Sequence, residues 1–149
     1  MKLFKPFIFV ACCFVGTVNA ATTQAFKDAA FNATVSWNGV QYKCVEYAKS
    51  LDTFIKANST KYAIKSYSYY EINNADGKGF MAHDDFDSGK NTITQNGRHV
   101  ITIVDGEVFD NYHPKGAVKA TWDSKLHNPA GTYPKGFTTT VISNIQQTK

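Results

Sequence analysis

The strongest periodic pattern in the chain begins at residue 42, where apolar positions recur at the three- and four-residue spacing of an α-helix. Charged side chains occupy the opposite face, so the predicted helix is amphipathic and packs its apolar stripe on another element. The Asn58-Ser59-Thr60 run predicts its end. Cys44 falls in the first turn, where unsatisfied backbone N–H groups and the helix dipole favour a negative charge. The apolar stripe consists of Cys44, Val45, Tyr47, Ala48, Leu51, Phe54 and Ile55.

Weaker patterns on either side of this helix predict the remaining elements. Residues 21–38 have a helical pattern, and residues 62–72 and 137–142 have the composition of strands. Residues 73–97 are polar and glycine-rich and predict a long loop, which is either a flap over a cleft or a surface excursion. A cysteine-bearing helix followed by antiparallel strands indicates an α+β fold rather than repeated βαβ units.

The clearest strand pairing is a β-hairpin in which the HVITIV and EVFDN segments flank a two-residue Asp105-Gly106 turn. The turn sets the register, and side chains alternate between the two faces of a strand. His99 and Asp110 are therefore predicted to be diagonal neighbours on one face. The next residue, Asn111, points to the other face, and a register shifted by one residue would exchange it with Asp110.

The composition is that of one globular domain. The 149 residues are 43% hydrophobic and 14% aromatic, which excludes a disordered chain. The formal net charge is +4, and it falls to +2 without the first 20 residues. This charge is too small to argue for binding to nucleic acid or to an anionic membrane surface.

Residues 1–20 have the features of a secretory signal peptide. A basic segment with Lys2 and Lys5 precedes an apolar core, and small residues follow, so that cleavage is expected after Ala20. The apolar core is too short to span a bilayer. We therefore expect a secreted or periplasmic protein, formed by a single domain of residues 21–149 with no stable membrane association after cleavage.

Cleavage would remove Cys12 and Cys13 and leave Cys44. In an oxidising compartment a lone thiol is a bystander, an intermolecular link or a reactive group. The reactive role requires a base. His99 with the Asp110 carboxylate beside it would supply the base and the orienting residue of a nucleophile–base–orienter triad. If the hairpin packs on the helix, the helix N-terminus and the imidazolium both lower the thiol pKa from its free value of about 8.5. A buried structural cysteine with an unrelated histidine is the alternative.

Two segments, YKCVEYAKSL and NGRHVITIVDGEVFDNYHPKG, resemble the papain-fold toxin domains of bacterial polymorphic toxin systems. The likeness is greatest to the small type whose histidine strand ends in V-[FY]-D-N-x-H-P-x-G, and it covers residues 37–116. It implies a minimal papain-like fold, akin to the NlpC/P60 peptidases, with the cysteine helix packed on a small antiparallel sheet. It also implies Cys44 as nucleophile, His99 as general base and acid, and Asp110 as the orienting residue.

The resemblance leaves the oxyanion hole open. Larger papain-like enzymes have a glutamine six residues before the cysteine, and here that position is Asn38, with Gln41 nearer to Cys44. The side-chain candidates for oxyanion or substrate contacts are Asn38, Gln41 and His113. The backbone N–H of Cys44 is a further donor, because main-chain groups often form such sites.

No metal and no cofactor are expected. The HDDFD run at residues 83–87 has a histidine and three aspartates, but neighbouring side chains in an extended or loop segment cannot all point inward. The sequence also has no calcium-loop or HExxH spacing. We interpret the run as a solvated loop.

The sequence predicts an exported papain-like cysteine hydrolase that acts on an amide bond as a peptidase, deamidase or acyl transferase. As a secreted antibacterial toxin or effector, it would have a peptide or protein substrate and a cognate inhibitor or immunity protein as partners. One alternative is a catalytically silent exported binding or antagonist protein on the same fold. A secreted protein dimerised through Cys44 is another.

Overall fold

The computed structural model describes residues 21–75, 79–129 and 136–145, so the expected signal peptide lies outside the described residues. Two helices come first, α1 (Gln24–Ala33) and α2 (Cys44–Asn58), joined through a 3-10 turn at Val35–Trp37. A third helix, α3 (Lys119–Lys125), lies late in the chain, and a short 3-10 turn covers Asp87–Gly89. The strands are β1 (Tyr67–Asn74), β2 (Met81–His83), β3 (Thr92–Thr94), β4 (Arg98–Val104), β5 (Glu107–Phe109), β6 (Ala117–Val118), β7 (Leu126–His127) and β8 (Phe137–Ile142).

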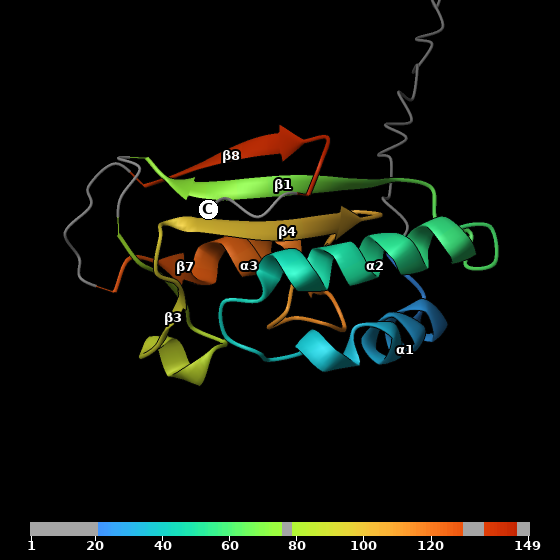
Figure 1. Ribbon diagram of the computed structural model, residues 1–149, viewed down its shortest axis with the longest axis horizontal. Coiled ribbons are helices and arrows are strands. Elements are labelled where there is room, and N and C mark those ends of the chain that lie inside the picture. Colours follow the sequence, from blue (N-terminus) through green and yellow to red (C-terminus); the bar gives the residue numbers. More distant parts are fainter. Residues whose placement is uncertain (1–20, 76–78, 130–135, 146–149) are drawn as a thin grey trace, which may run out of the picture.

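The strands form two antiparallel sheets. The larger has the order β6-β5-β4-β1-β8, and the smaller has the order β3-β2-β7. Figure 1 shows α2 lying along β4, with α1 beside α2. The α+β prediction is confirmed: the helix that begins with the cysteine packs on a small antiparallel sheet.

The two faces of the β4–β5 hairpin are covered by different elements. Val104 and Phe109 pack with residues of α1 and α2, whereas Ile101 and Val108 pack with Trp122 of α3. This alternation follows from the period of two along a strand. The hairpin is therefore buried on both sides, and its end residues lie between layers rather than on the surface.

The register of this hairpin is the one that the Asp105-Gly106 turn predicts. Val104 pairs with Glu107, Ile103 with Val108, and Thr102 with Phe109. Asp105 and Gly106 both have positive φ, as a tight two-residue turn requires. The helix of residues 44–58 and the last strand also occur where the sequence places them.

Two expectations about connecting segments were wrong. Residues 73–97 are not a plain loop, because β2 and β3 lie within this stretch and pair with each other. The late segment around Trp122, for which no helix or strand was predicted, forms α3 and the short strand β7. The first strand also begins later than predicted, after a turn in which Ala63 has a φ of 53°.

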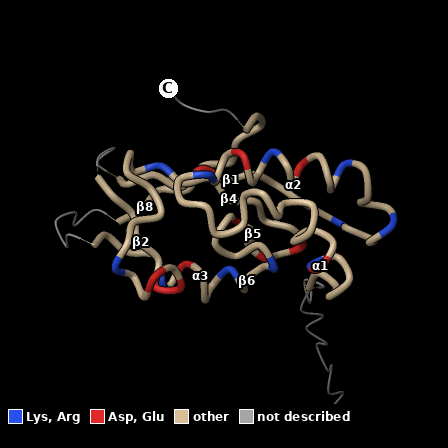
Figure 2. Tube along the Cα trace, turned by 60° about the horizontal axis from the view of Figure 1, so that its bottom comes forward, with Lys and Arg blue, Asp and Glu red and all other residues tan. Residues whose placement is uncertain are grey.

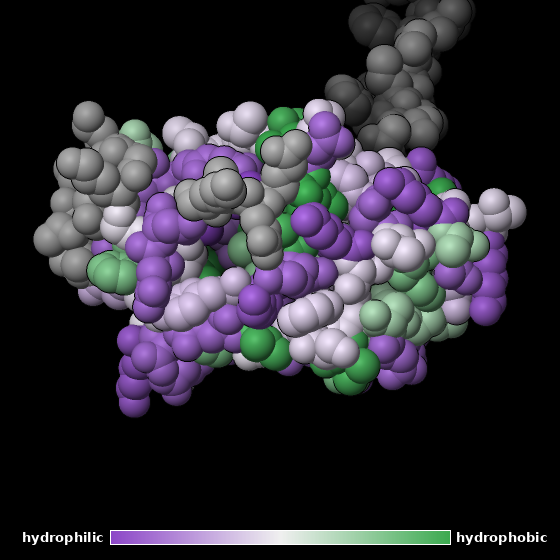
Figure 3. Space-filling model, in the orientation of Figure 1, coloured by the Kyte–Doolittle hydropathy of each residue, from purple (hydrophilic) through white to green (hydrophobic). Residues whose placement is uncertain are grey.

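The surface carries both signs of charge. Figure 2 shows basic and acidic residues interspersed along the chain trace. On the face seen in Figure 3, hydrophobic residues form small separate areas within a mostly hydrophilic or intermediate surface. Within the described ranges, no helix is long and apolar enough to cross a membrane.

Candidate active site

Cys44 is the first residue of α2; it is a free cysteine, and the residue is only 8% exposed. The residue before it, Lys43, occupies the N-cap position and provides no side-chain cap. The helix N-terminus, with its unsatisfied backbone N–H groups, favours a negative charge at this position. The side chain packs with Val45, Ala48 and Val100, so the cysteine helix contacts β4 at this point.

A tether joins the segment before Cys44 to the end of the hairpin. The Asn111 side chain donates a hydrogen bond to the Val40 carbonyl at 2.7 Å, and the Gly39 N–H donates to the Asn111 carbonyl at 2.5 Å. Asn111 is fully buried. These bonds hold the entry to α2 against the end of β5, and they bring the nucleophile candidate to the hairpin.

His99 is fully buried and bonds to Asp110 on the side predicted by the hairpin register. Its Nε2 donates to Asp110 Oδ2 at 3.0 Å. The imidazole stacks on Trp122, with an angle of 11° between the rings and 6.1 Å between centroids. Among the described residues its Nδ1 has no conventional hydrogen-bond partner, which leaves this nitrogen for the neighbouring Cys44 thiol.

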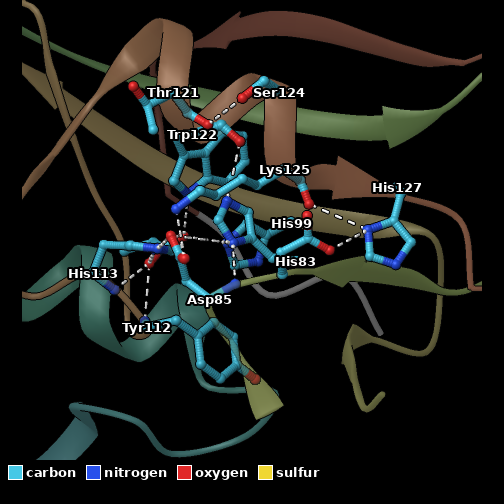
Figure 4. Close-up of polar contacts among 12 residues, drawn as sticks. His83, Asp85, His99, Tyr112, His113, Thr121, Trp122, Ser124, Lys125 and His127 are labelled. Atoms are coloured by element: carbon cyan, nitrogen blue, oxygen red, sulfur yellow. Dashed lines mark hydrogen bonds and ion pairs between the residues drawn. The ribbon is translucent and has the colours of Figure 1, made fainter. Parts of the chain in front are cut away.

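Asp110 is the most heavily bonded side chain of the site. Figure 4 shows three of the residues that bond to it, His99, His113 and Trp122, gathered close together. Oδ2 accepts from Trp122 Nε1 at 3.1 Å as well as from His99. Oδ1 accepts from the backbone N–H groups of Tyr112 and His113, at 2.9 and 2.6 Å, and from His113 Nδ1 at 2.9 Å. These five donors fix the carboxylate and, through it, the His99 ring.

The electrostatics of the three residues favour their charged forms. Burial raises the pKa of the Cys44 thiol, but the hydrogen bond and charge of His99, with smaller contributions from the Val100 N–H and Arg98, lower it below its ordinary value. Burial lowers the pKa of His99, but hydrogen bonds and charges from Asp110 and Cys44 raise it to about 10. Burial opposes ionisation of Asp110 too, yet His113 and His99 hold its pKa well below the ordinary value. These shifts favour a thiolate at Cys44, an imidazolium at His99 and a carboxylate at Asp110.

A cleft of about 380 Å³ opens beside the thiol. One wall is the start of α2 and the other is the segment that follows β3. The cleft is lined by Tyr42, Lys43, Cys44, Val45, Glu46, Ile93, Thr94, Gln95, Asn96 and Arg98. The stretch of residues 73–97 thus contributes a wall of the cleft rather than a distant excursion.

The other sequence-derived candidates are engaged elsewhere. The Asn38 amide accepts from Thr34 Oγ1 and donates to Phe31 O, both at 2.8 Å, which directs it toward α1. Gln41 Nε2 donates to the Tyr42 hydroxyl at 2.9 Å and to the Thr92 carbonyl at 3.0 Å, so both amide hydrogens are used.

His113 also has both ring nitrogens occupied. Nδ1 bonds to Asp110, and Nε2 lies 3.2 Å from Asp85 Oδ2. Its pKa is raised above the ordinary value, because the bonds and charges of these two carboxylates outweigh burial. His113 supports Asp110 from behind instead of lining the cleft.

Sequence reasoning missed two members of this network. Trp122, to which no role in the site was assigned, donates its indole N–H to Asp110. His83 was assigned to a solvated loop, but it is buried against Trp122 and donates from Nε2 to the Trp122 carbonyl at 3.0 Å. The buried Met81 and Ala82 before His83 were the available signal of a strand, although a run this short has no clear period.

The site has a cysteine at the start of a helix, a histidine on the antiparallel sheet on which that helix packs, and an aspartate directly after the neighbouring strand. This arrangement is that of a papain-like domain. The papain fold toxin 2 family matches residues 31–127, a stretch that contains α2, the hairpin and the HPKG segment. The chain belongs to this family. No curated protein and no solved structure gives a significant match.

Proposed function

We propose that this papain-fold toxin domain is an exported cysteine hydrolase that acts on an amide bond of a peptide or protein. The arrangement of Cys44, His99 and Asp110 beside an open cleft is the single observation that carries the proposal. A thiolate–imidazolium pair is the reactive form of a cysteine nucleophile, and a third group that orients the base completes the set.

In the first half of the reaction, the Cys44 thiolate attacks the carbonyl carbon and forms a C–S bond. The oxyanion lies at the N-terminus of α2, where the backbone N–H of Cys44 donates to it. The imidazolium of His99 gives its Nδ1 proton to the leaving amine, and the C–N bond breaks. Asp110 holds the ring through Nε2 during this transfer.

In the second half, the now neutral His99 takes a proton from water, and the hydroxide oxygen attacks the acyl–sulfur carbon. The C–S bond breaks, the acid product leaves, and Cys44 returns to its thiolate form beside a protonated His99. An amine in place of water would give acyl transfer by the same steps. Peptidase, deamidase and transferase chemistry therefore need the same three residues.

The partners and the location of this activity are part of the same proposal. A toxin that hydrolyses amide bonds requires a cognate inhibitor or immunity protein in the cell that makes it. The signal-peptide pattern of residues 1–20 supports export to the periplasm or the medium.

The test is the pH dependence of Cys44 alkylation by iodoacetamide, compared between the parent protein and His99→Gln. We expect alkylation that persists well below pH 7 in the parent and that moves toward the free-thiol pKa of about 8.5 in the variant. His127→Gln is the matched control, because this histidine lies outside the triad and should leave the profile unchanged.

Circular dichroism establishes that each variant is folded before its profile is interpreted. Alkylation of the parent that rises only near pH 8.5 would instead support the catalytically silent binding protein. A dimer on a non-reducing gel that is lost on reduction would support the protein linked through Cys44.

A further inference from the structure

We infer that His83, Asp85 and His113 form a binding site for a divalent transition-metal ion, with Zn²⁺ as the expected occupant. One ligand atom from each residue lies within 4.8 Å of the other two. The sequence excluded a metal at residues 83–87 because the neighbouring aspartates cannot converge. The fold supplies the missing ligand from a distant segment, since His113 follows β5.

The tautomers of both histidines place an acceptor nitrogen on the side of Asp85. His83 Nδ1 there accepts a hydrogen bond of 3.2 Å from the Asp85 N–H, which a bound ion would replace. His83 donates from Nε2 to the Trp122 carbonyl, and His113 donates from Nδ1 to the Asp110 carboxylate. Metal-binding histidines almost always donate their second ring nitrogen to a carboxylate or a backbone carbonyl, which fixes the ring orientation. Here both supports are already in place (Figure 4).

The inward-facing atoms converge on one carboxylate oxygen. Asp85 Oδ2 lies 3.2 Å from His113 Nε2 and 3.9 Å from His83 Nδ1. Bonds of about 2.0–2.2 Å to a tetrahedral Zn²⁺ place ligand atoms about 3.3–3.5 Å apart. The ligand atoms lie within 4.8 Å of one another, so no pair has to close by more than about 1.5 Å on binding. The other oxygen, Oδ1, is held by Lys125 at 2.6 Å, which leaves Oδ2 for the metal.

Burial and ligand type match a zinc site with an open position. His83 is 1% exposed and His113 is 10% exposed, whereas the Asp85 side chain is 40% exposed and faces solvent. Two imidazoles and a carboxylate are the protein ligands of one kind of Zn²⁺ site, in which water completes the coordination. Imidazole also disfavours Ca²⁺ and Mg²⁺, which prefer oxygen ligands.

Binding replaces a proton and connects the two sheets. The ion takes the place of the proton that His113 Nε2 shares with Asp85, and this proton goes to solvent. A bound ion would join the end of β2 to the segment after β5 and would hold His113 against Asp110. The site can bind metal whether or not the proposed hydrolase activity exists, so the two proposals are tested separately.

The experiment is a titration with Co²⁺, a spectroscopic substitute for Zn²⁺, of protein purified without a histidine tag. The Cys44→Ala variant is the starting protein, because a thiolate beside His99 is itself a potential metal ligand. We expect one equivalent of Co²⁺ to give visible d–d absorption, without a thiolate charge-transfer band, and Zn²⁺ to displace it.

Loss of a hydrogen bond that supports a metal ligand costs about 10–100-fold in metal affinity. In this background Asp85→Asn and His83→Gln each remove a ligand itself, so each should weaken the Co²⁺ affinity by at least that factor. Asp84→Asn is the matched control, because its carboxylate lies beside His127 and not in the cluster. Asp85→Asn is exposed and should fold even if His83→Gln does not. Absence of one-equivalent binding, or binding that survives Asp85→Asn, would overturn the proposal.

Discussion

Replacement of Asp110 by asparagine tests the central geometry of the site with a change of one atom. Three N–H donors point at Oδ1 and two at Oδ2, so both ends of the side chain must accept hydrogen bonds. An asparagine amide has one acceptor. We expect its oxygen to stay with the three donors of Tyr112 and His113, and its NH₂ group to face the N–H groups of His99 and Trp122.

The cost of this substitution follows from the two bonds lost and from the burial of the site. Hydrogen bonds to charged groups contribute about 1.5–3 kcal/mol each. Removal of one partner of a buried ion pair costs about 3–5 kcal/mol. Since His99 and Asp110 are 0% and 1% exposed, solvent does not screen the loss. Asp110→Asn should therefore lower the free energy of unfolding by about 3–5 kcal/mol, out of the about 5–15 kcal/mol typical of a domain.

Urea denaturation at pH 7 measures this loss, and Cys44 alkylation measures its effect on the thiol. Without the carboxylate the pKa of His99 falls, so the thiolate should require a higher pH. Asn111→Ala is the comparison variant, because it removes the hydrogen bond to the Val40 carbonyl, at a cost of about 1–3 kcal/mol, but leaves the carboxylate beside His99 in place. If Asn111→Ala moved the alkylation profile and Asp110→Asn did not, the assignment of the third residue would be refuted.

Three further predictions concern the thiol pair, acid stability and a tight turn. Cys44→Ser should lower the pKa of His99, because the thiolate charge and hydrogen bond help to raise it; NMR titration of the imidazole measures this, and an unchanged pKa would mean that the pair does not exist. Glu107 has a lowered pKa, since Lys27 and Thr22 outweigh burial, so it contributes stability that is present above its unfolded pKa of about 4.3 and is lost as the pH falls through its folded value. Urea midpoints at pH 7 and pH 3 should accordingly differ less in Glu107→Gln than in the parent, and an equal difference would contradict this. Gly116→Ala should lower the free energy of unfolding by at least about 1–3 kcal/mol, because φ is +80° and the new Cβ would lie 2.7 Å from Phe109 Cζ. Gly136→Ala has a similar φ but no atom within 4 Å of the new Cβ, so it should cost less in the same thermal-unfolding assay.

The parts of the fold that the sequence predicts are those with local rules. The periodicity of residues 44–58 predicts α2, and a two-residue Asp-Gly turn determines every pairing in the β4–β5 hairpin. From that register alone, His99 and Asp110 fall on one face. The contact between His99 and Cys44 is less local, and it was inferred only because two apolar faces must be buried against each other.

The parts that the sequence did not predict depend on distant contacts. Strands β2, β3 and β7 have two or three residues each, too few to show a period, and they are stabilised by pairing with one another. Helix α3 has one buried residue, Trp122, whose environment is built by the opposite face of the hairpin. For the same reason the convergence of His83, Asp85 and His113 has no counterpart in their sequence spacing.

Asp110 and His99 serve the fold as well as the proposed chemistry, and this limits what their presence implies. Asp110 accepts hydrogen bonds from β4, from the turn after β5 and from α3. A catalytically silent protein with this architecture would therefore need Asp110 too. Cys44 differs, because its apolar neighbours are small or branched side chains and alanine would fill most of the same space. Packing alone does not explain why a thiol lies at the N-terminus of α2, beside a histidine whose pKa is raised. The cysteine is therefore the residue that separates an enzyme from a binding protein on this fold, and its reactivity is the property that decides between them.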